Sequence, residues 1–255
     1  MLARFLKRPR PAEPFVSRSA AWETKRQPVT RLAPLVATGC VSFTAAPTPV
    51  VDDNLAEETF ARYVGWQIDQ GCGGLVVCGA TGEGATLSRA ERIRLIEIAV
   101  ETASSRAAVI AATGTNCTRE SITLTEAAQK SGASAALLTT PYYNKPGQRG
   151  LFCHFREIAR AVDLPLIIEI DPARAAINVE CETLVRLAEV PNIVAIAHAD
   201  GGLARLRTLR PSAQARFAHL CGTDDDCAEF GRGLGLDLKR GQHRSGRVVG
   251  SPTRH

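Results

Sequence analysis

The architecture of this protein can be read most directly from Gly74-Leu75-Val76-Val77-Cys78-Gly79-Ala80-Thr81-Gly82-Glu83. Residues 74–78 are apolar without interruption, which predicts a strand buried on both faces, as in parallel sheets covered by helices. A glycine-containing turn follows. Ser88, with Glu91 three residues later, then forms a capping box that predicts the start of a helix over residues 88–104. The region therefore reads as a strand, a turn and a helix.

The same alternation runs from about Val41 to Phe230. Short apolar or β-branched runs predict strands at residues 41–45, 73–78, 107–112, 134–139, 164–169, 192–197 and 215–220. Helical patterns predict helices at residues 54–70, 88–104, 118–131, 149–161, 179–189, 202–209 and 224–230. Such alternation with short connections is typical of parallel βαβ units, and a closed barrel of these units takes eight strands. We predict an α/β protein of the (β/α)8 TIM-barrel type, with about seven units and an incomplete C-terminal end.

The chain divides into three regions of different composition. Residues 1–40 are rich in arginine and interrupted by prolines, so we expect a disordered basic leader or a misplaced start codon, with a targeting peptide as the weaker alternative. Residues 41–230 are expected to form the barrel. Residues 231–255 are rich in Gly, Arg and Ser and lack apolar periodicity, which predicts an irregular tail. A basic RNA-binding tail is an alternative for this last region, and a shifted reading frame explains its composition better than a designed role.

Composition narrows the function classes. The chain has 255 residues, of which 45% are hydrophobic and 22% charged, as in ordinary globular proteins. No apolar run approaches the length of a membrane span. The formal net charge of +5 arises mainly at the two ends of the chain, and the central part has no basic stripe with interleaved aromatic residues. We therefore expect a cytoplasmic protein that binds neither nucleic acid nor a membrane.

The eight cysteines show no metal or disulfide framework. None of them forms a C-x-x-C pair, and most lie within apolar runs. Free thiols in a reducing compartment are the expected state. The sequence predicts neither a metal site nor a cofactor.

Three motifs in order carry a family resemblance. They are residues 74–83, the run Ala85-Thr86-Leu87-Ser88-Arg89-Ala90-Glu91-Arg92, and Thr140-Pro141-Tyr142-Tyr143-Asn144-Lys145-Pro146. Together they resemble the dihydrodipicolinate synthase / N-acetylneuraminate lyase family over roughly residues 48–226. The resemblance implies an eight-stranded barrel, commonly assembled as tetramers of tight dimers. It also implies class I aldolase chemistry on pyruvate or a similar 2-keto acid, in which a lysine forms a Schiff base.

Three residues match positions that matter in that family. Thr81 matches the threonine that binds the substrate carboxylate, in a loop that enters a helix. Tyr143 matches the relay tyrosine, which the resemblance places in the neighbouring subunit's site. Arg174 matches the arginine at the entrance, which can hold a second carboxylate. Pairing with another copy or with a paralogue is therefore expected to involve Tyr143.

Three other positions depart from the family pattern. Ala80 replaces the relay threonine, Glu169 replaces the tyrosine that shuttles protons, and Ala197 replaces the Schiff-base lysine. A methyl group cannot form an imine. Of the lysines elsewhere, Lys130 is predicted near the end of an outer helix and Lys145 in the tyrosine loop, so we expect neither to substitute.

Glu169 and His198 are predicted on adjacent strands near the barrel mouth. They suggest a repurposed acid–base or metal site, but strand alternation turns His198 towards the helices if Ala197 faces inward. The structural alternative is that Glu169 pairs with Arg174 and that His198 packs among helix contacts.

The functional expectation is a family member of lyase descent whose Schiff-base activity is lost or much reduced. One alternative is a non-catalytic module that binds a keto acid or a protein partner. The other is a lysine-independent lyase or hydratase that uses Glu169.

Overall fold

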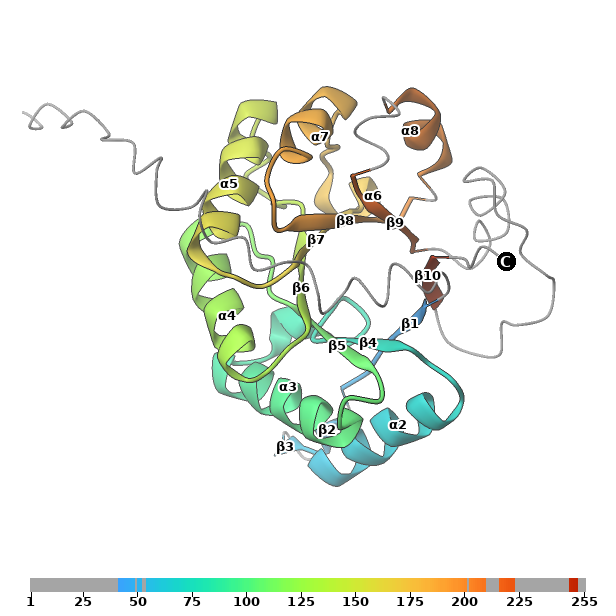
Figure 1. Ribbon diagram of the computed structural model, residues 1–255. Coiled ribbons are helices and arrows are strands. Elements are labelled where there is room, and N and C mark those ends of the chain that lie inside the picture. The colour runs from blue at the N-terminus through green and yellow to red at the C-terminus, as the bar shows by residue number, and fades with distance from the viewer. Residues whose placement is uncertain are drawn as a thin grey trace, which may run out of the picture.

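The computed structural model describes residues 41–48, 50–51, 54–200, 202–209, 216–222 and 248–251. Within these ranges the strands follow one another around an arc, and the helices lie along its outside (Figure 1). The predicted leader, the predicted helix at residues 224–230 and most of the predicted tail lie outside the described residues.

One eight-stranded sheet carries the fold, in the order β10-β1-β4-β5-β6-β7-β8-β9. Its strands are β1 (Val41–Ala45), β4 (Gly74–Val77), β5 (Ala108–Ala112), β6 (Ala135–Thr139), β7 (Leu166–Ile170), β8 (Ile193–His198), β9 (Ala218–Cys221) and β10 (Val248–Ser251). Neighbours from β1 to β9 are parallel. The seven predicted strands are confirmed with shifted ends, and the α/β class with parallel strands is confirmed with them. The short strands β2 (Val50–Val51) and β3 (Asn54–Leu55) form a separate antiparallel pair that the sequence did not predict.

Most of the described helices connect consecutive strands of the large sheet. They are α2 (Glu57–Asp69), α3 (Arg89–Ala103), α4 (Thr118–Lys130), α5 (Gln148–Ala161), α7 (Cys181–Leu187) and α8 (Leu203–Thr208). The predicted capping box of α3 is present: the backbone N–H of Ser88 donates to Glu91 Oε2 at 2.7 Å, and the N–H of Glu91 donates to Ser88 Oγ at 3.3 Å. None of the helices in the described ranges combines the length and apolarity needed to cross a bilayer.

Two short helical turns were not predicted. The 3-10 turn η1 (Gly84–Thr86) lies in the loop after β4, and α6 (Pro172–Ala175) follows β7. In α6, Asp171 is the N-cap and accepts a hydrogen bond from the N–H of Arg174, while proline occupies the first turn, where its missing N–H costs nothing.

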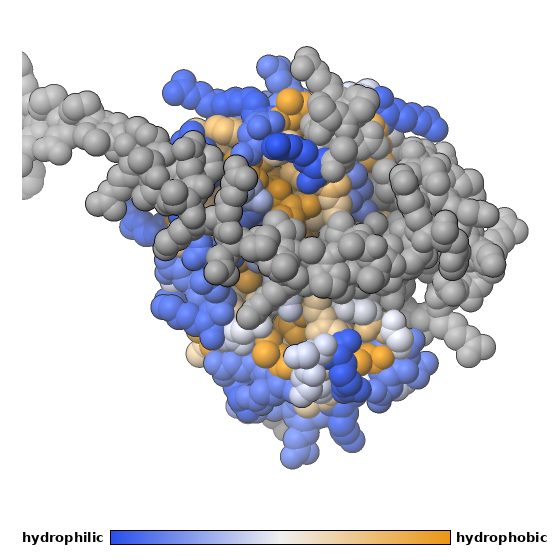
Figure 2. Space-filling model, in the orientation of Figure 1, coloured by the Kyte–Doolittle hydropathy of each residue, from blue (hydrophilic) through white to orange (hydrophobic). Residues whose placement is uncertain are grey.

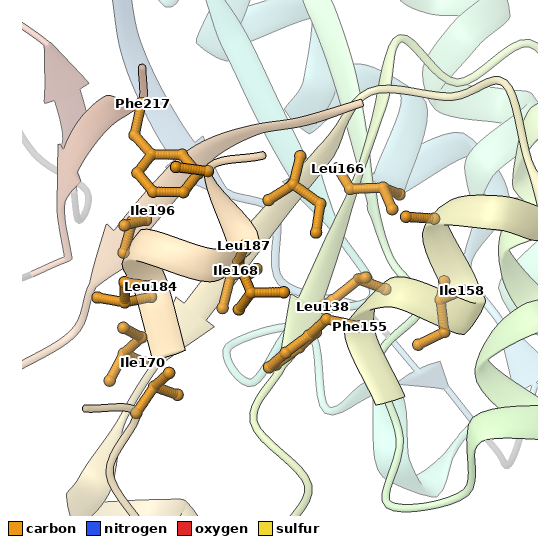
Figure 3. Close-up of a cluster of buried hydrophobic side chains, with 14 of the residues drawn as sticks. Leu138, Phe155, Ile158, Leu166, Ile168, Ile170, Leu184, Leu187, Ile196 and Phe217 are labelled. Carbon is orange, nitrogen blue, oxygen red and sulfur yellow. The ribbon is translucent and has the colours of Figure 1, made fainter. Parts of the chain in front are cut away.

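The outer faces of the strands pack against the helices. Around β6, β7 and β8 this layer contains Phe155 and Ile158 from α5 together with Ile168 and Ile196 from the sheet (Figure 3). A second cluster joins β4 and β5 to α2 and α3 through residues such as Phe60 and Leu95. The surface in Figure 2 shows hydrophilic side chains along the outside of the helices and apolar ones nearer the middle of this face. This amphipathic arrangement is what a layer of helices over a buried sheet requires.

The inner faces carry smaller side chains. Their cluster consists of Val76, Ala108, Ile110, Ala135, Leu137, Ile167, Val194, Ala195, Ala197 and Leu220. Except at Val194, next to a register shift between β7 and β8, these residues alternate along each strand with those of the outer clusters. The inside of the arc is therefore apolar and rich in alanine.

The end of the chain differs from the sequence prediction. Val248–Ser251, within the expected irregular tail, forms β10 and pairs antiparallel with β1, with Val41 opposite Ser251. β10 thus covers one edge of β1, whereas β9 is the last strand at the other end of the described sheet. The physical reason for strand β10 has two parts. Val248-Val249 is a β-branched pair, which favours extended backbone. The edge of β1 offers unpaired N–H and C=O groups with which an extended segment can pair. A short run of this kind shows no periodicity from which it could be predicted.

Candidate functional site

The candidate site lies at the C-terminal ends of the parallel strands, where the motifs of the sequence analysis meet. The loop after β4 contains Ala80 and Thr81, both exposed. Its path is set by close backbone contact: a Cβ on Gly84 would lie 1.9 Å from the carbonyl oxygen of Cys78, so only glycine fits there. Thr48 Oγ1 donates to the carbonyl of Gly82 at 2.9 Å and ties the loop to the segment after β1.

The loop after β6 presents Tyr143. Its side chain is 88% exposed and its φ is 68°, a left-handed conformation that costs a non-glycine residue free energy. The next residue, Asn144, donates through Nδ2 to the carbonyl of Asn116 at 3.0 Å, which anchors the loop. Tyr143 therefore points away from the interior of its own chain.

Glu169 lies on the inner face of β7. Its register partners are Thr139 on β6 and Ala197 on β8. Burial, followed by the charge of Asp171, raises the pKa of the Glu169 carboxyl, and a hydrogen bond from the Thr139 side chain and the charge of Arg174 oppose that rise. The carboxyl thus lies at the inner mouth of the arc. The effects of burial and of Asp171 on its pKa exceed those of Thr139 and Arg174, so the net pKa is raised.

Arg174 does not form the ion pair with Glu169 that the structural alternative expected. Its Nε lies 3.5 Å from Asp171 Oδ2, and its side chain is 54% exposed. The reason is local, because Asp171 is the N-cap of the short helix that contains Arg174 and is therefore the nearer carboxylate. Arg174 lies in the segment directly after the C-terminal end of β7, and its charge is paired with that of Asp171.

Ala197 is buried among the inner apolar side chains, with 6% of its surface exposed. It lies in register with Glu169 on β7 and Leu220 on β9. In the described part of the chain the lysines are Lys130, at the end of α4, and Lys145, in the tyrosine loop, and both are exposed. Within these ranges no amine lies on an inward-facing strand position.

His198, the next residue, points outward as the alternation of β8 predicts. It is fully buried, and its Nδ1 accepts from Arg205 Nη1 at 2.9 Å while its Nε2 lies 3.1 Å from His219 Nδ1. Burial, with the charges of His219 and Arg205, holds its pKa well below the usual value. Glu169 and His198 therefore lie on opposite faces of the sheet and do not form the acid–base pair considered from the sequence.

Sequence reasoning missed the polar network beneath α8. Arg205 is buried and binds Asp200 through both carboxylate oxygens, at 2.6 and 3.0 Å, and Asn178 Oδ1 at 2.9 Å. Asp200 and Arg205 are five residues apart across a turn, and this spacing has no recognisable pattern. The network holds α8 against the sheet on the side away from Ala197.

Metal ligands do not gather in the described part of the chain, where no group of three or more His, Cys, Asp or Glu side chains could hold an ion. No disulfide joins any two of the six cysteines in that part, which are Cys72, Cys78, Cys117, Cys153, Cys181 and Cys221.

Comparison with known proteins shows which family this chain belongs to. The model of the Dihydrodipicolinate synthetase family matches residues 38–237. This chain belongs to that family. The resemblance drawn from the three motifs is thereby confirmed, and so is its barrel scaffold.

Named relatives of the dihydrodipicolinate synthetase family are similar over most of this chain. The 4-hydroxy-tetrahydrodipicolinate synthase of Parvibaculum lavamentivorans is 44% identical over 189 residues, which are 74% of this chain and 65% of that protein. The synthase of Syntrophobacter fumaroxidans is 45% identical over 183 residues, 72% of this chain and 63% of that protein. The chain thus spans less than two thirds of the length of these relatives.

Solved structures of the family share the fold. The dihydrodipicolinate synthase of Acinetobacter baumannii, described as chloride-inhibited and complexed with pyruvate, has a TM-score of 0.74 and 42% identity, and the match covers 78% of this chain and 68% of that chain. The enzyme of Aquifex aeolicus has a TM-score of 0.72 and 36% identity over the same shares of the two chains.

Proposed function

We propose that this protein is a dihydrodipicolinate synthetase family member whose Schiff-base aldolase activity is lost or much reduced. The observation that supports the proposal is the buried Ala197 methyl group on the inner face of β8, where the family resemblance calls for a lysine amine. The ligand class we assign is pyruvate or a similar 2-keto acid, and the compartment is the cytoplasm.

The chemical argument is that two groups of one catalytic unit are absent together. A neutral amine must attack the keto carbon, and a proton shuttle must serve the resulting intermediates. Ala197 supplies no lone pair, and Glu169 supplies a carboxyl instead of a phenol. Groups that act as a unit fail as a unit, so the loss of either removes most of the rate.

Borohydride trapping tests this proposal. The full chain is incubated with pyruvate and sodium borohydride, and its intact mass is measured, with the Acinetobacter baumannii enzyme as the positive control. We expect no adduct on this chain and one reduced pyruvate on the control. A stoichiometric adduct on this chain would refute the proposal, and peptide mapping would then identify the amine.

A second candidate function is partner binding through the tyrosine loop. The 88% exposure of Tyr143, on a loop anchored by Asn144, favours it. Sedimentation velocity should show a smaller particle for Tyr143→Ala than for the wild type if this loop joins copies or paralogues. Trp66→Ala, which removes another exposed aromatic side chain on α2, is the matched control. Equal particle sizes for the wild type and Tyr143→Ala would rule the candidate out.

A third candidate is a lysine-independent lyase or hydratase. The buried position of Glu169 at the inner mouth of the arc favours it, because burial raises the pKa of a carboxyl and so shifts it towards the range in which general acids work. Screening 2-keto acids for consumption by the wild type and by Glu169→Gln provides the test. Turnover by the wild type that Glu169→Gln lacks would support this candidate over loss of activity.

A further inference from the structure

Glu169 is the one ionisable side chain on the inward-facing positions of the described strands β4 to β9, where its neighbours are alanine, threonine and branched aliphatic residues. We propose that Glu169 is a second, independent barrier to imine chemistry in this barrel, because it would hold any lysine placed at position 197 as an ammonium ion and because it disfavours the carboxylate of a 2-keto acid. This inference extends the proposed function, on which it rests for the identity of the reaction.

The register of β7 and β8 brings the two positions together. Glu169 and Ala197 are Cα partners in a parallel pair, and their side chains project to the same face. Neighbouring strands lie about 4.8 Å apart, so a lysine stem at position 197 reaches the Glu169 carboxylate easily. An ion pair at this separation needs no backbone movement.

The surrounding charges compensate this carboxylate only in part, because the charge of Arg174 is the smallest of the influences on its pKa. Arg174 is bound to Asp171 and is half exposed, and Asp171 itself adds a second negative charge near Glu169. Thr139 offers a hydrogen bond but no charge. Burial is the main cause of the raised Glu169 pKa and the charge of Asp171 adds to it, so a lysine ammonium ion in register would stabilise the ionised carboxylate.

The consequence for a lysine is large. An opposite charge within about 4–6 Å moves a pKa by about 1–3 units towards the charged form, so the neutral amine becomes about 10- to 1000-fold scarcer at a given pH. If the Glu169 carboxylate is removed, the apolar cluster around position 197 lowers the pKa of a lysine amine there. Burial disfavours the charged form, so more of the amine is neutral and nucleophilic.

The chemistry requires that neutral amine. Its lone pair forms the C–N bond to the keto carbon, one of its two protons and one proton from solvent pass to the carbonyl oxygen, and that oxygen leaves as water to give an iminium ion that keeps the other proton on nitrogen. Borohydride then transfers a hydride to the iminium carbon and fixes a secondary amine. An ammonium ion has no lone pair, so it cannot begin the sequence.

Four variants test the barrier: Ala197→Lys, Ala197→Lys with Glu169→Gln, Ala197→Lys with Glu182→Gln, and Glu169→Gln alone. Glu182 is an exposed carboxylate on α7, so its removal controls for a general change of charge. The measured quantity is the rate of pyruvate trapping by borohydride near pH 7. We expect the Glu169→Gln double variant to react at least about tenfold faster than both Ala197→Lys and the Glu182→Gln double variant.

Equal trapping rates in Ala197→Lys and its Glu169→Gln double variant would overturn the inference. That outcome differs from failure of the proposed function, which would show as an adduct on the wild type or on Glu169→Gln alone.

Burying a lysine can prevent folding, so a second measurement uses no lysine. Pyruvate binding to the wild type and to Glu169→Gln is compared by titration calorimetry near pH 7, after far-ultraviolet circular dichroism has shown that both are folded. Tighter binding to Glu169→Gln supports the inference, because an anion no longer meets a carboxylate. Equal or weaker binding contradicts it.

Discussion

The two faces of β7 and β8 differ in the role of their side chains: the outer face packs against helices, and the inner face lines the candidate site. On the outer face, Ile168 and Ile196 are fully buried against α5 and α7, in a layer that also contains Phe155. On the inner face, Glu169 and Ala197 occupy the positions that family resemblance assigns to a tyrosine and a lysine. Because side chains alternate along a strand, adjacent residues of the same strand belong to different environments. Packing and chemistry can therefore change independently in this barrel.

This difference explains how the shared fold can coexist with the departure from the family's catalytic residues that we propose. The TM-score of 0.74 with the Acinetobacter baumannii enzyme depends on the backbone and on the outer layers that hold it. The imine, by contrast, depends on a single nitrogen. Fold similarity carries no information about that atom.

The largest effect on stability is expected from a substitution in the outer layer, between the strands and the helices. Phe155→Ala removes a fully buried ring and should lower the free energy of unfolding by about 3–5 kcal/mol, measured by urea denaturation. Ala197→Gly, on the inner face, should cost no more than about 1 kcal/mol. Similar losses in the two variants would break the contrast between the faces.

A second effect concerns His154, which lies on α5 beneath the outer surface. Its Nδ1 is 2.9 Å from Thr118 Oγ1, its Nε2 has no hydrogen-bond partner, and burial lowers its pKa from 6.5 to about 4. Below pH 6.5 the unfolded chain binds a proton that the folded chain does not. Stability is therefore expected to fall as the pH falls from about 6.5 to about 4, by about 3 kcal/mol at roughly 1.4 kcal/mol per unit.

His154→Leu isolates this contribution. The change in unfolding free energy between pH 7 and pH 4.5 should be smaller in the variant than in the wild type, although the buried His198, whose pKa is also lowered, contributes in both. An unchanged pH dependence would show that His154 titrates normally in the folded protein.

The smallest effect is expected at the inner face. The pKa of Glu169 is raised in the folded protein, so the stability that its protonated form contributes is present below about pH 4.5 and is lost as the pH rises through the folded pKa. Glu169→Gln should therefore be slightly more stable than the wild type at pH 7 and equal to it at pH 4. Thermal melts at the two pH values measure the difference, and a less stable variant at pH 7 would show that the ionised carboxyl has a favourable partner.

Much of this fold was predictable from local pattern. The apolar run before Cys78 became β4, the capping box at Ser88 became the start of α3, and the alternation along β8 placed His198 outward. These predictions succeed because a strand or helix buried on a known face imposes a short period on the sequence. The helical turn at Pro172 and the strand at Val248–Ser251 are too short to show a period, so they were missed.

The candidate site was only partly predictable. The replaced positions Ala80, Glu169 and Ala197 followed from matching motifs, whereas the partners of Glu169 did not. The pairing of Arg174 with Asp171, the hydrogen bond from Thr139 and the Arg205 network under α8 all depend on where separate segments come to lie. Pairwise contacts between distant segments leave no trace in the composition of either one.

The amino-acid sequence by itself determined the class of the fold, the order of its strands and helices, and the absence of an amine at position 197, because each of these is a property of neighbouring residues or of a single side chain. The tertiary structure alone decided that Glu169 faces Ala197 in register, that Arg174 is already paired, and that His198 belongs to the helix layer. These are properties of strand register and of packing between segments far apart in the chain, and they arise only when the sheet is assembled.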